Sequence, residues 1–495
     1  MISRPIVFLT VCCCYLLSVI QSPAAPSKES HATRKVTAIS DCVTSLSRQA
    51  KYANAIVSVA VLDPQTSEVL FEHNSSTAMI PASCMKILSS ATAMHFLGPD
   101  HRFTTTLEAS GIVTSGVLEG DIIIRGGGDP CLASDRVEDS MSSESLLNAW
   151  VDAVKASGIR SIKGGVLADD TFLPREPLPD NHTIDDIGNY YAAGTCGLTF
   201  HDNLYYLTLR PGAQVGAPAE ILRASPPLPG MEWTNQVTTA APKTRDGTNI
   251  YGYPDTFTRV ITGTIPLGGE FTVKGSLPAP ALTAAQMLED RLVRAGIPVD
   301  RAPGVASETV TTSTHMLAQT MSPPLAKIIR TLNKQSFNLY AEMMLMLAGK
   351  AAGTTSREEA IKAEKVWLES IGTPLNGFRI DDGSGLSRGD TVTAHGMVRL
   401  LAALQRQSWF ETWKSTLPIL GIDGDLRDRQ KDSPLRGRVQ AKTGLISRVR
   451  GHCGYLQARS GSIYCFAIIV NYYTCPWAEV DSDTDAILMA IYNSL

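Results

Sequence analysis

Two residues three positions apart give the first indication of chemistry in this sequence. Ser83 and Lys86 lie in the stretch PASCMKIL, where an apolar run with helical spacing begins. Side chains three positions apart on a helix share one face, with their β-carbons roughly 5–6 Å apart. A neutral lysine amine at that distance can accept the hydroxyl proton of the serine, and burial favours the neutral form. The Ser-x-x-Lys spacing occurs once in the chain. It predicts a nucleophile with its base, against the alternative of a helix cap followed by a surface lysine.

Two more short patterns follow in an order that suits acyl transfer. Ser336 and Asn338 form Ser-x-Asn within a helical region or at its edge, and Lys442, Thr443 and Gly444 form Lys-Thr-Gly in a strand-like run. A second hydroxyl beside an amine can relay a proton to a leaving nitrogen, and an amide can orient peptide groups. A lysine at a strand edge attracts a substrate carboxylate, and the strand backbone can pair with an extended peptide.

The elements that must position these residues come from both ends of the chain. Residues 56–62 and 68–73 are rich in β-branched side chains and predict a hairpin just before the helix. Two further strands are predicted near the end of the chain, at 450–457 and 463–473, with long helical patterns before them. Strands at both ends with helices between them predict one sheet, with the β-rich stretch 101–314 as an insertion.

The three motifs, in this order, resemble those of the low-molecular-mass class C penicillin-binding proteins, which are D-alanyl-D-alanine carboxypeptidases and endopeptidases. Two further segments are similar to that family, RGGGDP at 125–130 and DDGSGLSR at 381–388. The resemblance implies an α/β (α+β) fold with an antiparallel sheet flanked by helices, as in DD-peptidases and serine β-lactamases, and a large β-rich insertion. It implies a peptidase domain and two inserted domains, which we expect at 36–100 plus 315–495, at 101–186 plus 262–314, and at 187–261.

The resemblance also implies roles for the first two motifs. Ser83 is expected to be the acylated nucleophile and Lys86 the base that activates it. Ser336 is expected to relay the proton, and Asn338 to hold the substrate backbone. The implied substrates are peptidoglycan stem peptides, with β-lactams as acylating inhibitors, and no cofactor or metal is implied.

The third motif carries the one departure from the family pattern. Lys442, Thr443 and Gly444 are implied to bind the substrate, with the first two attracting its terminal carboxylate. The backbone N–H groups of Ser83 and Leu445 are implied to form the oxyanion hole. Family members usually have Thr or Ser after Lys-Thr-Gly, whereas this chain has Leu445. The weaker carboxylate anchor leaves open whether the enzyme cleaves the terminal D-alanine or a cross-link.

Composition limits the partners of the protein, and its first residues predict export. The chain has 495 residues, 44% of them hydrophobic, which suffices for a large core, and its net charge of -4 offers no basic field to nucleic acid. Arg4 precedes an uncharged run at 6–20, which falls short of the ~20 residues that span a bilayer. Small residues follow, so we expect a signal peptide at 1–24 and export to the periplasm or cell envelope. An uncleaved anchor, or lipidation at one of Cys12, Cys13 and Cys14, remains an alternative. No later run is long enough to span a membrane.

Seven cysteines follow the signal segment, so at least one thiol is expected to be free in an oxidising compartment. Cys453 and Cys465 flank a turn and could face each other across a hairpin. Cys84, next to Ser83, is expected to be a buried packing residue, because adjacent side chains on a helix do not share a face.

Three other interpretations compete with the peptidase. A β-lactamase of the same fold would hydrolyse penicillin quickly, and a non-catalytic protein would use the insertion to bind the cell wall. Residues 385–389 match the nucleophile elbow of α/β-hydrolases, with Ser387 as nucleophile and His395 or His452 as base. That elbow requires an apolar strand directly before it, and the preceding residues are polar.

Overall fold

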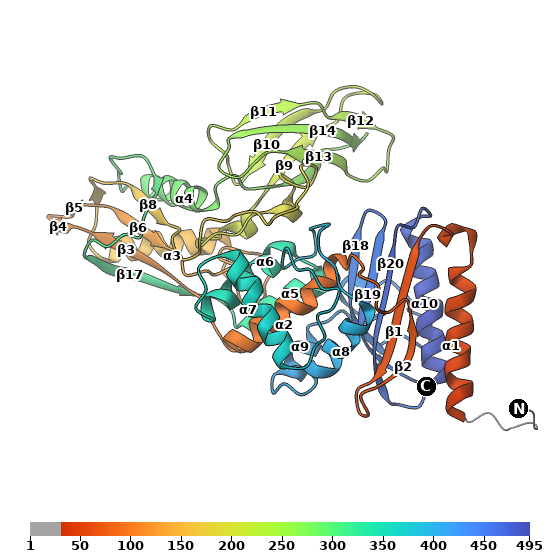
Figure 1. Ribbon diagram of the computed structural model, residues 1–495. Coiled ribbons are helices and arrows are strands. Elements are labelled where there is room, and N and C mark those ends of the chain that lie inside the picture. The colour runs from red at the N-terminus through yellow and green to blue at the C-terminus, as the bar shows by residue number, and fades with distance from the viewer. Residues whose placement is uncertain (1–30) are drawn as a thin grey trace, which may run out of the picture.

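The computed structural model describes residues 31–495, with side chains from Val36 onward. The predicted signal peptide at 1–24 therefore lies outside the described residues. Both ends of the described chain contribute to one antiparallel sheet with the strand order β18-β19-β20-β1-β2. Its strands are β1 (Ile56–Asp63), β2 (Glu68–His73), β18 (Val439–Ile446), β19 (Val449–Gln457) and β20 (Ile463–Asn471). The predicted sheet from the two ends of the chain is thus confirmed, with β18 at its edge (Figure 1).

The strands of this sheet are apolar on both faces because both faces are covered by helices. In β1, Val57, Val59 and Val61 point to one core, whereas Ala60 and Leu62 point to the other. The first core lies against α1 (His31–Ser47) and α10 (Trp477–Ser494), which pack on each other beside the sheet (Figure 1). The second core lies against α8 (Ala394–Leu404) and the central helices.

The central helices carry two of the three motifs. They are α2 (Lys86–Leu97), α5 (Leu325–Gln335), α6 (Asn338–Ala351), α7 (Arg357–Ser370) and α9 (Phe410–Ser415). α2 packs along α6, whose residues Leu339–Gly349 are all buried. Helices that are apolar all round form the interior of a domain. The helix starts at Lys86 and Asn338 therefore meet in the core.

The inserted segment follows α2 and precedes α5 in the chain, and it forms further sheets. It extends away from the central helices (Figure 1). One sheet has the order β16-β8-β6-β3-β17, with strands Gly304–Val305, Val166–Asp169, Ile122–Arg125, Thr104–Ser110 and Thr314–Met321. A small sheet beside it has the order β4-β5-β7, with strands Ile112–Thr114, Val117–Glu119 and Ser161–Ile162. Helices α3 and α4, Ser143–Ala156 and Pro280–Arg294, pack with these strands.

The remaining strands of the insertion form two more sheets. The first has the order β10-β9-β15, with strands Glu220–Ser225, Leu204–Arg210 and Phe271–Ser276. In the second, β14 (Thr258–Pro266) pairs with Glu232–Asn235, Thr238–Ala240 and Gly247–Tyr251, which are β11, β12 and β13. The predicted fold class, a helix-flanked antiparallel sheet with a β-rich insertion, is confirmed, and the predicted domain limits stay a prediction.

The cysteine prediction is wrong at one point. The register of β19 and β20 places Cys465 opposite Tyr455 and Cys453 opposite Ala467, so the two cysteines are not directly opposed. Cysteines 42, 84, 131, 196, 453, 465 and 475 are all free. Cys84 is fully buried, as expected. Among residues 31–495, no helix combines the length and the apolarity needed to cross a bilayer.

Candidate active site

Ser83 lies in a tight turn that two glycines from distant segments approach closely. The turn is a 3-10 helix, Ala82–Met85, and α2 begins only at Lys86, so Ser83 does not cap the helix. A Cβ on Gly444 would lie 2.4 Å from the carbonyl oxygen of Pro81, and one on Gly385 would lie 1.9 Å from that of Ala82. Only glycine allows the edge strand and the 381–388 loop to approach the turn this closely. Glycines on two distant segments thereby fix the position of Ser83.

Lys86 is buried and has three oxygen partners, one of which is the hydroxyl of Ser83. Its side chain is fully buried, and its Nζ lies 2.8 Å from Ser83 Oγ, 2.7 Å from Asn338 Oδ1 and 2.7 Å from the carbonyl oxygen of Ser384. A neutral amine has two N–H donors and one lone pair. In the neutral form the two carbonyl oxygens can accept the two N–H groups, which leaves the lone pair for the hydroxyl of Ser83. This arrangement lets Lys86 accept the hydroxyl proton.

The surroundings of Lys86 favour that neutral form. Burial, and to a lesser extent the positive charge of Lys442, lowers the pKa of Lys86 to about 7, while Asp382 and Glu342 oppose this change. A base whose pKa is near neutral is well matched to proton transfer at physiological pH. Burial and the charge of Lys442 therefore favour the neutral form of Lys86.

The Ser-x-Asn motif joins α5 to α6. Ser336 ends α5 in the left-handed conformation with φ 56°, and α6 begins at Asn338. Besides accepting from Lys86, Asn338 donates through Nδ2 to the carbonyl oxygen of Tyr191, 2.8 Å away, in the inserted segment. The hydroxyl of Ser336 makes no hydrogen bond to any residue in 31–495, so it can bond a substrate.

The Lys-Thr-Gly motif lies on edge strand β18, beside the turn of Ser83. Lys442 is fully buried, with Nζ 2.9 Å from the carbonyl oxygen of Thr443 and 3.5 Å from a carboxylate oxygen of Asp425. Thr443 donates its hydroxyl to the same oxygen of Asp425. The side chain of Leu445 is 45% exposed. Asp425 thus orients both side chains, and this role was not predicted from the sequence.

Carboxylates anchor the 381–388 loop and thereby place the Ser384 carbonyl. Asp382 Oδ1 accepts the backbone N–H groups of Ser384 and Gly385 at 3.0 and 2.6 Å. Glu342 Oε1 accepts the N–H groups of Gly383 and Ser384 at 3.1 and 2.9 Å. Each of these two buried oxygens accepts two backbone N–H groups of the loop, which fixes the loop backbone.

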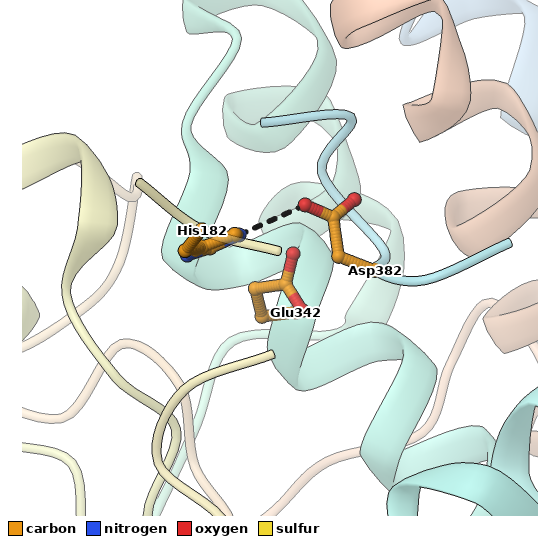
Figure 2. Close-up of side chains that lie close together, drawn as sticks. All are labelled: His182, Glu342 and Asp382. Atoms are coloured by element: carbon orange, nitrogen blue, oxygen red, sulfur yellow. Dashed lines mark hydrogen bonds and ion pairs between the residues drawn. The ribbon is translucent and has the colours of Figure 1, made fainter. Parts of the chain in front are cut away.

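His182, Glu342 and Asp382 form the one group among the described residues with ligand atoms close enough for a metal, all within 4.8 Å of one another. Figure 2 shows the histidine pointing at Asp382, with Glu342 beside them. The carboxylate oxygens already accept hydrogen bonds, from backbone N–H groups and, at Glu342 Oε2, from Arg357 at 2.8 Å. A hydrogen-bond network accounts for this cluster better than a cation would.

The hydrolase elbow is not formed. Ser387 is buried in a loop without a preceding strand, and its hydroxyl donates to Asp381 at 3.2 Å. His395 Nδ1 lies 2.6 Å from Glu72 Oε1, and His452 Nε2 lies 2.6 Å from the Arg429 guanidinium. Neither histidine is a hydrogen-bond partner of Ser387.

The structure therefore brings the side chains of Ser83, Lys86 and Asn338 into direct contact, and it places the Lys442 strand against the same turn. Sequence reasoning missed Tyr191, His182, Glu342 and Asp425. For the Ser384 carbonyl the only signal was the resemblance of DDGSGLSR to a family segment.

The comparisons with known proteins agree with this geometry. The model of the D-Ala-D-Ala carboxypeptidase 3 (S13) family matches residues 40–489. A D-alanyl-D-alanine carboxypeptidase of Actinomadura sp. (strain R39) is 28% identical over 492 residues, which is 96% of this chain and 89% of that protein.

Two solved structures share the fold. The crystal structure of penicillin-binding protein 4 from Haemophilus influenzae has a TM-score of 0.76 and 21% identity, over 92% of this chain and 98% of that one. The same protein complexed with a β-lactam has a TM-score of 0.70, with the same identity and coverage. Because the family model spans nearly the whole described chain, this protein belongs to the D-Ala-D-Ala carboxypeptidase 3 (S13) family and is a hydrolase of that class.

Proposed function

We propose that this protein cleaves D-alanyl-D-alanine peptides of peptidoglycan through an acyl-enzyme on Ser83, with Lys86 as the base. The contact that carries the proposal is the 2.8 Å approach of Lys86 Nζ to Ser83 Oγ, with two carbonyl oxygens accepting the amine's own N–H groups. A surface lysine after a helix cap would be solvated, whereas this one is fully buried.

In the first step, Lys86 accepts the hydroxyl proton as Ser83 Oγ attacks the carbonyl carbon of the scissile bond. The developing negative charge falls on the carbonyl oxygen, where the backbone N–H groups of Ser83 and Leu445 would bind it. The C–N bond then breaks, and the proton passes through Ser336 to the leaving amine. Water then attacks the ester while Lys86 accepts a proton from it, and Lys86 returns this proton to Ser83 Oγ as the ester bond breaks, which releases the peptide acid and restores the Ser83 hydroxyl.

The substrate binds along the edge of the sheet. Within the main sheet β18 pairs with β19 only, and on its other side its first residues bond the 418–420 segment. The edge beyond Lys442 is therefore where an extended peptide can pair with the strand. Lys442 and Thr443 attract the terminal carboxylate, Gly444 allows the strand to lie against the Ser83 turn, and Asn338 orients the peptide backbone. Leu445 supplies no hydroxyl to the carboxylate, so we expect cleavage of cross-links to compete with removal of the terminal D-alanine.

The same site accounts for acylation by β-lactams, in which Ser83 opens the strained amide ring and the leaving nitrogen stays attached to the acyl group. The β-lactam complex of the Haemophilus influenzae protein supports this part of the proposal. The family's substrate lies in the cell wall, which supports the proposal that the chain is exported. The periplasm or envelope is then its place of action.

Labelling with a fluorescent penicillin tests the proposal. Wild type should carry a stable adduct on the peptide that contains Ser83, and Ser83→Ala and Lys86→Ala should carry none. Ser387→Ala is the matched serine control, and it should still carry the adduct on Ser83. Rapid loss of label with release of hydrolysed penicillin would indicate a β-lactamase. Absence of label on folded wild type would refute the acyl-enzyme proposal.

A further inference from the structure

A histidine of the inserted segment reaches the machinery that holds the catalytic base. His182 lies between β8 and β9, 85 residues after the end of α2 and 156 residues before the start of α6. Its Nε2 lies 2.9 Å from Asp382 Oδ2, and the two side chains are 3% and 0% exposed. Figure 2 shows the two side chains end to end. A buried contact of this quality between distant segments fixes their relative position.

Asp382 passes this contact on to Lys86. One carboxylate oxygen accepts the N–H groups of Ser384 and Gly385, and the other accepts that of Ser387 at 2.8 Å together with the His182 bond. The carbonyl of Ser384 then accepts from Lys86 at 2.7 Å. His182 is therefore two residues removed from the base. A shift of the Ser384 carbonyl would turn the lone pair of Lys86 away from Ser83.

The charges that surround His182 are mostly negative. Asp382 and Glu342 are the anions that act on His182, and Arg357 of α7 is a cation that opposes them. Further out, Asp390 lies against Asp382, Glu364 lies near both carboxylates, and Asp381 accepts from neighbouring Asn181 at 2.7 Å. Burial, assisted by the charge of Asp382, raises the pKa of Asp390 well above its usual value, and burial raises that of Glu364 to about 7. Asp382 and Glu342 are therefore the main anions that a positive His182 would balance.

We propose that His182 is a positioning residue for the acylation step: it clamps the loop that carries the Ser384 carbonyl, and its positive charge offsets Asp382 and Glu342 so that Lys86 stays neutral. The inserted segment thereby helps to determine the position and the protonation of Lys86. This inference rests on the proposed function, because it assigns His182 to the Ser83–Lys86 reaction.

The electrostatics of the two sites agree with this role. Burial would lower the pKa of His182, but the hydrogen bond to Asp382 and the charges of Asp382 and Glu342 outweigh burial and raise it. The same two carboxylates raise the pKa of Lys86. If the positive charge of His182 is removed, the negative charges of Asp382 and Glu342 stabilise protonated Lys86 more strongly, and the pKa of Lys86 rises.

The test is the rate of acylation by a fluorescent penicillin, measured from about pH 5 to about pH 9 on the full chain. His182→Gln keeps an N–H donor that can reach Asp382 and removes the charge. We expect the midpoint of its acid limb to rise by about half a unit to one unit, and the rate near pH 6 to fall about threefold to tenfold. His182→Asn is too short to bridge the gap, and its plateau rate should also fall, by roughly tenfold to a hundredfold. His315→Gln, at an exposed histidine on β17 of the same inserted segment, is the matched control and should follow the wild type.

A merely structural role would lower the rate equally at every pH, with the midpoint unchanged, and that result would overturn the charge balance. A His182→Gln variant with both the midpoint and the plateau rate of wild type would overturn the whole inference. If neither variant folds, the histidine C–H resonances of wild type decide the question. His182 must titrate above the usual range of a histidine, and a His182 that is neutral near pH 5.5 would overturn the proposal. Failure of wild type itself to be labelled would instead count against the proposed function.

Discussion

The rate of Ser83 acylation should fall over a narrow range as the pH is lowered, because Lys86 can act as a base only when it is not protonated. The pKa of Lys86 is lowered to about 7 in the folded protein. The neutral fraction is then about 90% near pH 8 and about 3% near pH 5.5. Acylation of Ser83 should therefore be about thirtyfold slower at the lower pH, with a single proton controlling the acid limb.

The structure also predicts how the midpoint of this acid limb should change when a neighbouring charge is removed. After burial, the charge of Lys442 is the largest cause of the lowered pKa of Lys86. Lys442→Met removes that charge, so protonated Lys86 becomes more favourable and the midpoint should rise by about one unit. Lys442→Met should also weaken substrate binding. The midpoint is the pH at which the rate is half its plateau value, so it can be determined even when the plateau rate is lower.

The assay is stopped-flow acylation by a fluorescent penicillin at matched ionic strength, with circular dichroism at each pH as the control for unfolding. A rate that stays constant between about pH 5.5 and about pH 8 in folded protein would refute the assignment of Lys86 as a neutral base. An unchanged midpoint in Lys442→Met would refute the role of Lys442 in setting it.

Three further substitutions test the geometry. Gly385→Ala would place a Cβ 1.9 Å from the Ala82 carbonyl oxygen at a residue with φ +79°. We expect the free energy of unfolding, measured by urea denaturation, to fall by about 2–4 kcal/mol. Acylation, measured by labelling, should be at least roughly tenfold slower. Asn338→Ala removes one acceptor of Lys86 and the bond to Tyr191, and the acylation rate should fall roughly a hundredfold while the far-ultraviolet spectrum stays native. Leu445→Thr restores a hydroxyl beside the carboxylate site, and release of D-alanine from a D-Ala-D-Ala peptide should rise roughly tenfold relative to cleavage of a cross-linked dimer. An unchanged ratio would contradict the role given to this position.

Much of the fold could be predicted from local patterns. The β-branched runs at 56–62 and 68–73 indicated β1 and β2, since alternation of buried side chains depends only on neighbouring residues. The helix start was misplaced by a turn. Ser83 belongs to a 3-10 turn that Gly444 and Gly385 contact closely, from segments about three hundred residues or more away in the chain. A local sequence pattern contains no information about these contacts.

By itself, the sequence determined which residue types could react and in what order: a serine one turn before a lysine, a serine-asparagine pair within a helical region or at its edge, and a lysine-threonine-glycine strand. Only the tertiary structure decided the state of Lys86, because its burial and its two carbonyl acceptors come from α6 and the 381–388 loop. The same is true of Asp425 beside Thr443 and of His182 beside Asp382. Short-range spacing follows from backbone geometry, whereas desolvation and charge balance exist only after distant segments have packed together.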